Sequence, residues 1–161
     1  MSKTALAIVA FGFTVLSACG GTTTSEIPEA DAIEEAVLAV NAEMTQAGES
    51  ADADRLFSFI LETDKGSIIQ NGRFFLTRGE ALEEVKRNLG RIEAVDYQWT
   101  RRFVTVLSPE LALLTAEGES TATTMNGETF KTPFAQTMVF VLKQGEWKVL
   151  HAHQSSPPVP R

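Results

Sequence analysis

The chain has only two histidines, His151 and His153, and both lie in its last apolar-patterned segment, residues 146–155. Alternate side chains of a β-strand share a face, so we expect both to project with Trp147 and Val149. A face that begins apolar and ends in imidazoles can close a core at one end and line a cavity at the other. A neutral imidazole beside a carboxylate can act as a general base near neutral pH.

The second half of the chain reads as a meander of long strands. Apolar alternation is interrupted at Ser108-Pro109, Asn126-Gly127 and Gln144-Gly145, which are typical turn sequences. Short turns join antiparallel neighbours. We therefore predict strands over residues 92–106, 111–124, 129–142 and 146–154.

The first half reads as helices around one hairpin. Asp31 to Glu34 has the form of a capping box before a helix that ends at Gly48, and a second helix is expected over 53–61. Asn71-Gly72 between apolar runs predicts a hairpin, and Thr77 to Glu80 a second capping box for a helix ending at Gly90. The predicted fold is α+β: a long curved antiparallel sheet wrapped around three N-terminal helices.

Pairing the strands through two-residue loops gives a candidate pocket. Met138 then faces His151, Gln136 faces His153, and the preceding strand adds its own side chains beside them. The expected ligand-binding residues are Thr115, Glu117, Gln136, Met138, His151 and His153.

Two of these residues, His153 and Glu117, are the candidate catalytic bases. Two histidines two residues apart with Glu117 could also form a three-ligand metal site. No further ligand is evident, so we predict neither a metal nor another cofactor. Which of Arg101 and Arg102 faces the pocket stays open.

The N-terminus reads as a secretion signal. Residues 1–18 combine Lys3, a short apolar run and small residues, and Leu16-Ser-Ala-Cys19 resembles the lipobox of bacterial lipoproteins. That resemblance implies cleavage before a lipidated Cys19, a flexible tether over 19–30, and a domain over 31–156 before a short tail, 157–161. It also implies a bacterial envelope protein held by this lipid, with Gly20 favouring the outer membrane and a domain facing the periplasm.

The order of elements and the ending Gly145-x-Trp147-x-x-x-His151-x-His153-x-Ser155 resemble the nuclear transport factor 2-like superfamily, a cystatin-like fold. Closer to this chain within it are the SnoaL-like and calmodulin-dependent kinase association-domain-like groups. The resemblance implies a cone enclosing one pocket. It leaves function open, because this superfold hosts enzymes, binders and assembly modules.

Three functions are therefore considered. The first is a lipid-anchored domain that binds a small apolar or amphipathic molecule. The second is an enzyme of the isomerase or cyclase kind, or one resembling the iota-type carbonic anhydrases, whose His-His-Ser-Ser ending is interrupted here by Gln154. The third is an oligomeric assembly module.

Partners follow from charge and from the predicted outer face of the sheet. The formal net charge is −7 and no basic cluster extends beyond Arg101-Arg102, so a nucleic-acid partner is not expected. An apolar outer face suggests a homodimer, as in many members of the superfamily. The residues expected there are Ala135, Thr137, Val139, Val141, Leu150 and Ala152.

Lipidation of Cys19 can be tested directly. We expect Cys19→Ala to leave an unprocessed precursor that incorporates no labelled palmitate when the full chain is expressed in a bacterium, because the chain then lacks its only thiol. Palmitate labelling equal to that of the unchanged chain would contradict the lipoprotein interpretation.

Overall fold

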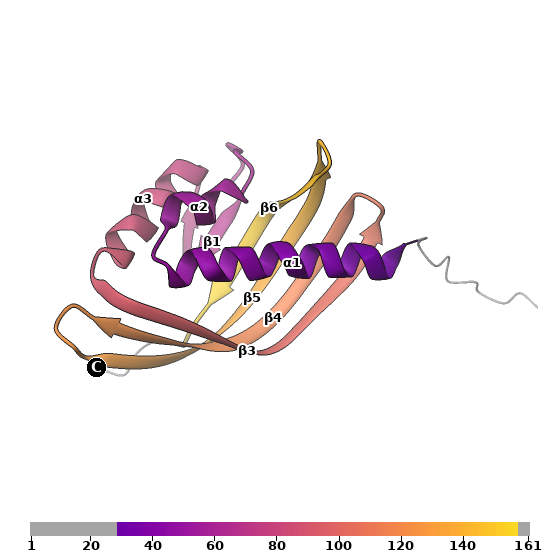
Figure 1. Cartoon of the computed structure of the whole chain (residues 1–161). Helices are drawn as coiled ribbons and strands as arrows, with labels where there is room; N and C mark the ends of the chain where they lie inside the picture. Colours follow the sequence, from indigo (N-terminus) through magenta and orange to yellow (C-terminus); the bar gives the residue numbers. More distant parts are fainter. Residues whose placement is uncertain (1–28, 158–161) are drawn as a thin grey trace, which may run out of the picture.

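A computed structural model describes residues 29–157 as three helices and six strands (Figure 1). The signal sequence and most of the tether predicted above lie outside these residues. Among the described helices, none is long and apolar enough to cross a bilayer. The elements are α1 (Ala30–Glu49), α2 (Ala53–Ser58), β1 (Ile68–Gln70), β2 (Arg73–Phe75), α3 (Arg78–Leu89), β3 (Ile92–Ser108), β4 (Leu111–Thr124), β5 (Thr129–Lys143) and β6 (Glu146–Ser155).

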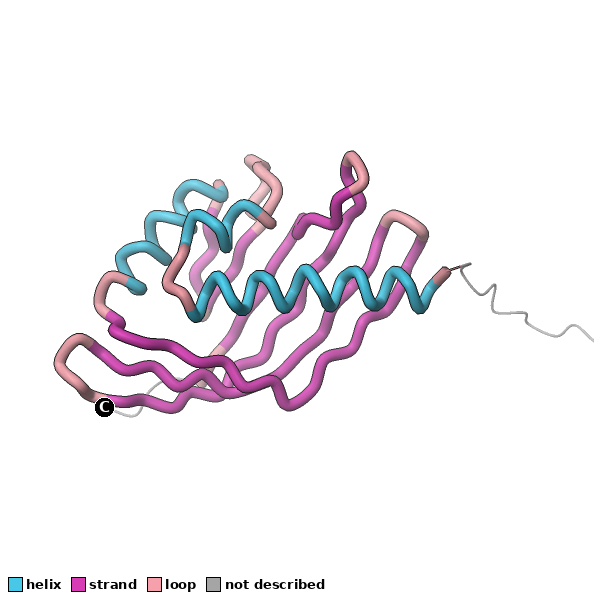
Figure 2. Tube along the Cα trace, viewed as in Figure 1, coloured by secondary structure: helices cyan, strands magenta, loops and turns pink. Residues whose placement is uncertain are grey.

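The strands form one sheet in the order β2-β1-β6-β5-β4-β3. β3 to β6 make the predicted antiparallel meander, while β1 joins β6 in parallel. Figure 2 shows the long strands bending, with the helices on one side of the sheet. The α+β fold predicted from the sequence is confirmed, and each of the four long strands begins and ends within two residues of its predicted bounds.

The first helix begins differently from the prediction. Asp31 is not its cap: the helix starts at Ala30, and Glu29 occupies the N-cap position with φ 68° and no side-chain hydrogen bond. Nor does Gly48 end the helix, which continues to Glu49. The predicted Asn71-Gly72 hairpin is present, with φ 50° and 77° at these two residues, as a two-residue turn of this type requires.

The turn between β4 and β5 is one residue longer than expected. Thr124 donates its N–H to the carbonyl of Glu128, so Met125, Asn126 and Gly127 form a three-residue loop, with Gly127 at φ 81°. Pairing along both strands shifts by one position, and Met138 lies beside Leu114 instead of Thr115. Since side chains alternate, a shift of one residue moves a whole strand's expected set to the other face.

A β-bulge in β6 has the same effect on the last strand. Phe140 pairs with Val149 as predicted, but the next pair is Val139 with His151, which leaves Leu150 as the extra residue. The bulge coincides with a change of partner. Before it, Val149 is hydrogen-bonded to Phe59 and Leu61, and beyond it β6 pairs with β1. Everything after Leu150 is turned to the opposite face from the prediction.

The core lies between the helices and the inner, concave face of the sheet. Val37 of α1 packs in one cluster with inward side chains of β4, β5 and β6. The largest fully buried apolar side chains are Phe140, Leu114, Val37 and Val149.

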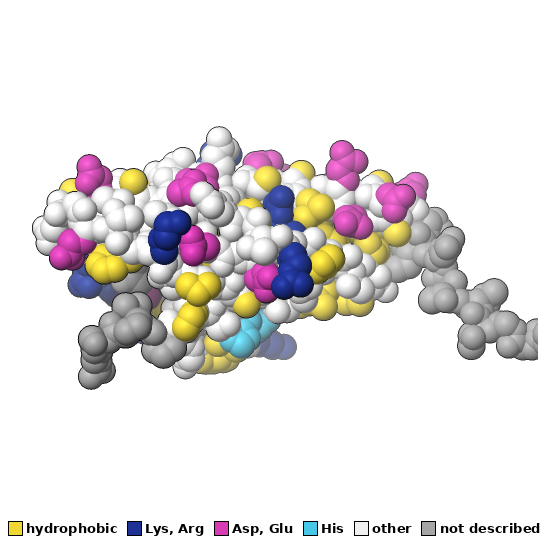
Figure 3. Space-filling model, turned by 90° about the horizontal axis from the view of Figure 1, so that it is seen from below, with side chains coloured by type: hydrophobic (Ala, Val, Ile, Leu, Met, Phe, Trp, Pro, Cys, Tyr) yellow, Lys and Arg dark blue, Asp and Glu magenta, His cyan; other side chains and the backbone are white. Residues whose placement is uncertain are grey.

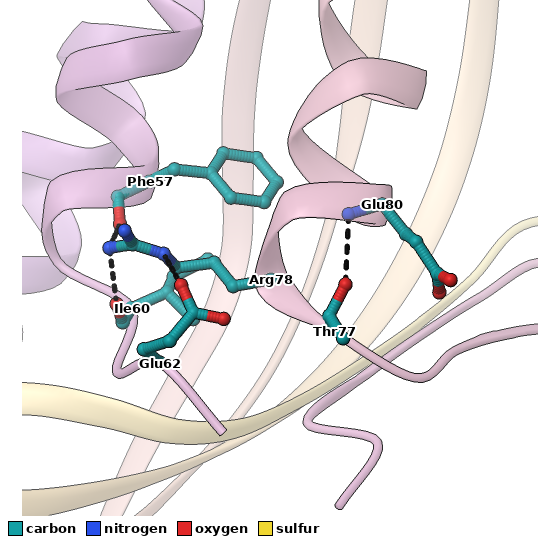
Figure 4. A network of polar contacts seen from close by, with 6 residues as sticks. All are labelled: Phe57, Ile60, Glu62, Thr77, Arg78 and Glu80. Atoms are coloured by element: carbon teal, nitrogen blue, oxygen red, sulfur yellow. Dashed lines mark hydrogen bonds and ion pairs between the residues drawn. The ribbon is translucent and has the colours of Figure 1, made fainter. Parts of the chain in front are cut away.

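Arg78, at the start of α3, holds α3 against the end of α2 (Figure 4). Its Nη1 donates to the carbonyl oxygens of Phe57 at 3.2 Å and Ile60 at 3.1 Å, and its Nε donates to Glu62 at 3.0 Å. Arg78 thus adds donors to carbonyl oxygens at the C-terminus of α2 and just beyond it, where the helix leaves carbonyls without partners of its own. Beside it, Thr77 caps α3 by accepting from the N–H of Glu80.

Removing this clamp should loosen the α2–α3 pair. We expect Arg78→Gln to lower the free energy of unfolding by about 1–2 kcal/mol, because hydrogen bonds to charged groups contribute more than neutral ones and this side chain is one-third exposed. Chemical denaturation of the full chain measures the loss.

Arg87→Gln on the same helix is the matched control, since Arg87 is exposed and pairs only with Glu84 among the described residues. Equal stability changes in the two variants would contradict the clamp.

Candidate ligand-binding site

A cavity of about 170 Å³ lies between the helices and the inner face of the sheet. Its walls come from every helix and from β1, β3, β5 and β6. The sheet side can be built from the observed register, row by row across neighbouring strands.

Apolar residues fill the first two rows. Val149, Phe140 and Ala112 stand side by side and are fully buried, and the isolated bridge from Ile60 to Val149 extends this row. The next row is Ile68, Ala152, Met138 and Leu114.

The third row is a line of glutamines. Gln70 of β1 pairs with Gln154 of β6, which pairs with Gln136 of β5, and all three line the cavity. Nε2 of Gln70 donates to Oε1 of Gln154 at 3.4 Å. The wall therefore changes from apolar to polar along the strands, as expected from the sequence, but largely through different side chains.

Three aromatic rings form the wall beyond the glutamines. The Phe134 ring meets Trp99 edge-on at 5.2 Å and Tyr97 at 5.9 Å between centroids. Gly118 makes this packing possible, because a Cβ there would lie 2.5 Å from the carbonyl oxygen of Gln98 and 3.1 Å from the Phe134 ring. On the helix side, a Cβ at Gly48 would lie 3.2 Å from the Tyr97 ring. The glycine in α1 is thus explained by close approach and not by a helix end.

The helix α1 adds two polar groups to the cavity. Thr45 donates its hydroxyl to the carbonyl of Asn41 at 2.9 Å and accepts from Nε1 of Trp99 at 3.3 Å. Asn41 is 1% exposed, and its Oδ1 accepts from Nη1 of Arg102 at 3.3 Å. Its amide NH₂ is thereby left to serve the cavity that the residue lines.

The predicted pocket residues divide between the two faces. Gln136 and Met138 line the cavity, whereas Thr115, Glu117 and His151 do not. The longer β4–β5 turn places Thr115 and Glu117 on the outer face instead of the inner one. The β6 bulge has the same effect on His151.

His153 borders the cavity through its place in β6, but its pairing with Thr137 and its exposure direct the imidazole to the outer face. Gln154 is the inward residue at this level. Figure 3, which views the molecule from below, shows histidine side chains at the surface beside hydrophobic ones.

Glu117 is held by an arginine on the outer face. Its Oε1 accepts from Nη2 of Arg101 at 2.7 Å and from Nε at 2.8 Å. Arg102, one residue on, lies on the side of α1, with its guanidinium 5.6 Å from the Trp99 ring centroid. Within residues 29–157, no three His, Cys, Asp or Glu side chains come together as a metal site.

Sequence reasoning missed Gln70, Gln154, Asn41 and Tyr97. A signal was available for Asn41, a polar residue four positions after Val37 on the apolar face of the helix. The sequence around Gln70 gave no such signal, since this residue meets its partner Gln154 across 84 residues of the chain.

Tyr97 is an ionisable side chain of the cavity wall, and its pKa is shifted by its surroundings. Burial raises the pKa of this phenol above its ordinary value, and the negative charge of Glu49 adds to the effect. Glu49 lies close because its Oε1 accepts from the Tyr97 backbone N–H at 3.1 Å.

An alkaline titration can measure this shift cleanly, because Tyr97 is the only tyrosine. We expect the tyrosinate absorbance of the folded full chain to rise at higher pH than in denaturant, where the pKa is about 10. A pKa raised by folding means that the folded state disfavours the phenolate. Its contribution to stability is therefore complete below the unfolded pKa and lost as pH rises through the folded pKa.

Glu49→Gln should remove only the smaller part of the shift, because burial is the larger cause. Coincident titrations of the folded and the denatured chain would show that Tyr97 is not enclosed.

Comparison with known proteins agrees with this architecture. A structure of a provisionally named dehydratase of the NTF2-like family from Streptomyces avermitilis matches with a TM-score of 0.69 and 23% identity, over 81% of this chain and 99% of that one. An NTF2-like superfamily protein from Salmonella enterica matches at 0.67 and 16%, over 81% and 92%. An uncharacterised protein with a cystatin-like fold from Caulobacter vibrioides matches at 0.64 and 16%, over 77% and 89%.

No curated protein matches the chain. The SnoaL-like domain family matches residues 37–160, which include most of α1, every later element and all the residues that line the cavity. The chain therefore belongs to the SnoaL-like domain family, and it shares the fold of the NTF2-like proteins.

Proposed function

We propose that this domain binds a small apolar or amphipathic molecule in the cavity between its helices and its sheet. The observation that carries the proposal is the composition of the wall: apolar and aromatic side chains with a few convergent amide and hydroxyl groups, and no Asp, Glu, Lys or Arg among the described lining residues. Such a wall is typical of small-molecule sites.

The two candidate bases give the enzymatic alternative little support from geometry. Glu117 is paired with Arg101 on the outer face, and the His153 imidazole is directed to the same side. A general base must reach the proton it removes, within hydrogen-bonding distance or through one water. The dehydratase named among the similar structures supports no shared activity at 23% identity.

The size of the cavity limits the ligand. An engineered apolar cavity of about 150 Å³ accommodates benzene. The 170 Å³ here is therefore suited to a single ring with a small substituent.

Filling the cavity from the sheet tests this function. We expect toluene, titrated into the purified full chain, to change the fluorescence of Trp99, which lines the cavity. Ala152→Leu should weaken toluene binding by roughly tenfold or more, because the added carbons occupy the space beside Met138.

Ala94→Leu is the matched control, since Ala94 is exposed on β3 and outside the cavity wall. Binding that survives in Ala152→Leu, or that is lost equally in Ala94→Leu, would place the toluene site elsewhere.

We propose further that lipid on Cys19 holds this domain at a bacterial envelope membrane, with the domain facing the periplasm. The support is the sequence Leu16-Ser-Ala-Cys19 behind an apolar run and ahead of a polar tether. Residues 19–28 lie outside the described part of the chain, and Gly20 is the only feature that favours the outer membrane.

The outer face of the sheet supports a homodimer, which we propose as the assembled form. Phe103 is 61% exposed and Leu150 40%, and half-buried Leu113 and Val139 lie between their strands. The bulge alters the expected face: Ala152 turns inward and His153 takes its place beside Thr137, while His151 lies beside Val139, where Leu150 was expected. A surface of this kind is apolar enough to favour association.

We expect light scattering of the full chain in detergent, corrected for bound detergent, to give twice the chain mass. Val139→Asp should give a monomer, because it places a charge at the centre of this face. A monomeric unchanged chain at micromolar concentration would exclude the dimer.

A further inference from the structure

We propose that the cavity selects a neutral single-ring molecule with a carboxamide-type polar end, and discriminates against the carboxylate of the same shape. This inference rests on the proposed binding function and narrows its ligand class. Three features of the wall carry it: the row of glutamines, the placement of charge, and the aromatic side.

The row of glutamines offers paired donors and acceptors. Oε1 of Gln154 accepts from Gln70, so the Gln154 NH₂ is left to donate into the cavity. Within residues 29–157, the side-chain amide of Gln136 is not engaged by another group. Inward residues on paired strands lie within ~5.5 Å at Cβ, so both amides can reach the carbonyl oxygen and the N–H of one carboxamide.

A donor on the opposite wall adds to this polar end. The Asn41 amide NH₂ remains for the cavity because its oxygen accepts from Arg102. An uncharged acceptor on the ligand would satisfy it, and a ligand without one would leave buried donors unpaired, which is costly.

Charge disfavours an anion in this space. Glu49 accepts from the backbone N–H of Tyr97 at 3.1 Å, so a negative charge already lies beside this wall and disfavours a second anion there. Two arginines are hydrogen-bonded to wall residues: Arg102 to Oδ1 of Asn41, and Arg78 to the carbonyls of Phe57 and Ile60. Arg102 lines an open depression together with Asp31, Glu34 and Glu35, and Arg78 is paired with Glu62, so solvent and carboxylates screen both charges. A carboxylate in the cavity would lose its hydration without gaining a countercharge.

The aromatic side and the volume define the rest of the ligand. Phe134 and Trp99 present an edge-to-face pair, which suits the edge or face of one further ring. A monocyclic compound with a small substituent fits within the 170 Å³.

Benzamide and benzoate form a matched pair of probes, equal in shape and different in charge. Titrated into the purified full chain near neutral pH, benzamide should bind at least roughly tenfold more tightly than benzoate. Benzoate binding should strengthen as pH falls toward the pKa of the free acid, because the neutral acid then becomes available.

Two variants distinguish loss of the polar contact from loss of the cavity. The double variant Gln136→Leu with Gln154→Leu should lose most of its preference for benzamide and keep toluene binding. Gln98→Leu makes the same chemical change on the exposed outer side of β3 and should alter neither.

The outcomes distinguish a failure of this inference from a failure of the proposed binding function. If toluene binds and benzoate equals benzamide, the selection for neutral ligands is overturned while the binding function stands. If benzamide is preferred but the double glutamine variant retains that preference, the glutamine row is not the polar contact and the inference fails. If neither toluene nor benzamide binds, the proposed function fails with it.

Discussion

The last strand changes partner half-way along its length, and the placement of the cavity residues depends on that change. Up to Val149, the strand is hydrogen-bonded to Phe59 and Leu61 at 2.8 and 2.9 Å, and from Ala152 onward it follows β1. Leu150, the extra residue of the bulge, lies between these two partners. Ala152 and Gln154 thereby face the cavity, and both histidines face outward.

Small residues keep the enclosed space from being filled. Ala152 stands on the cavity wall where a larger side chain would occupy the space, and Gly48 lets Tyr97 approach α1. The opposite wall is held by hydrogen bonds from Arg78 to the end of α2, which fix Phe57 and Ile60 over the same space. The cavity thus results from short side chains within a hydrogen-bonded frame, and not from loose packing.

The two faces of the sheet separate two kinds of chemistry. The inner face holds amides, hydroxyls and aromatic rings, which can orient a neutral molecule without ionising it. The outer face holds the imidazoles and the Arg101–Glu117 ion pair, together with the exposed apolar groups of the proposed dimer contact. A sheet only one residue thick keeps these sets apart because neighbouring side chains point in opposite directions. The SnoaL-like fold alone decides none of this, since the chemistry lies in the side chains placed on it.

The sequence by itself determined the fold class and most of the element bounds, because apolar periodicity, Thr77 as a cap and the Asn71-Gly72 and Gln144-Gly145 turns are local signals. It also indicated that the inner face would pass from apolar to polar, and it placed Gln136 and Met138 correctly on the cavity wall.

Only the tertiary structure decided which other side chains line the cavity beside Gln136 and Met138. The extra loop residue at Met125–Gly127 and the bulge at Leu150 each move a strand by one position, and alternation turns that single step into a change of face. Neither step has a local signal: the bulge lies where the strand passes between two partners distant in sequence, and Gln70 reaches Gln154 only through a parallel pairing across the chain.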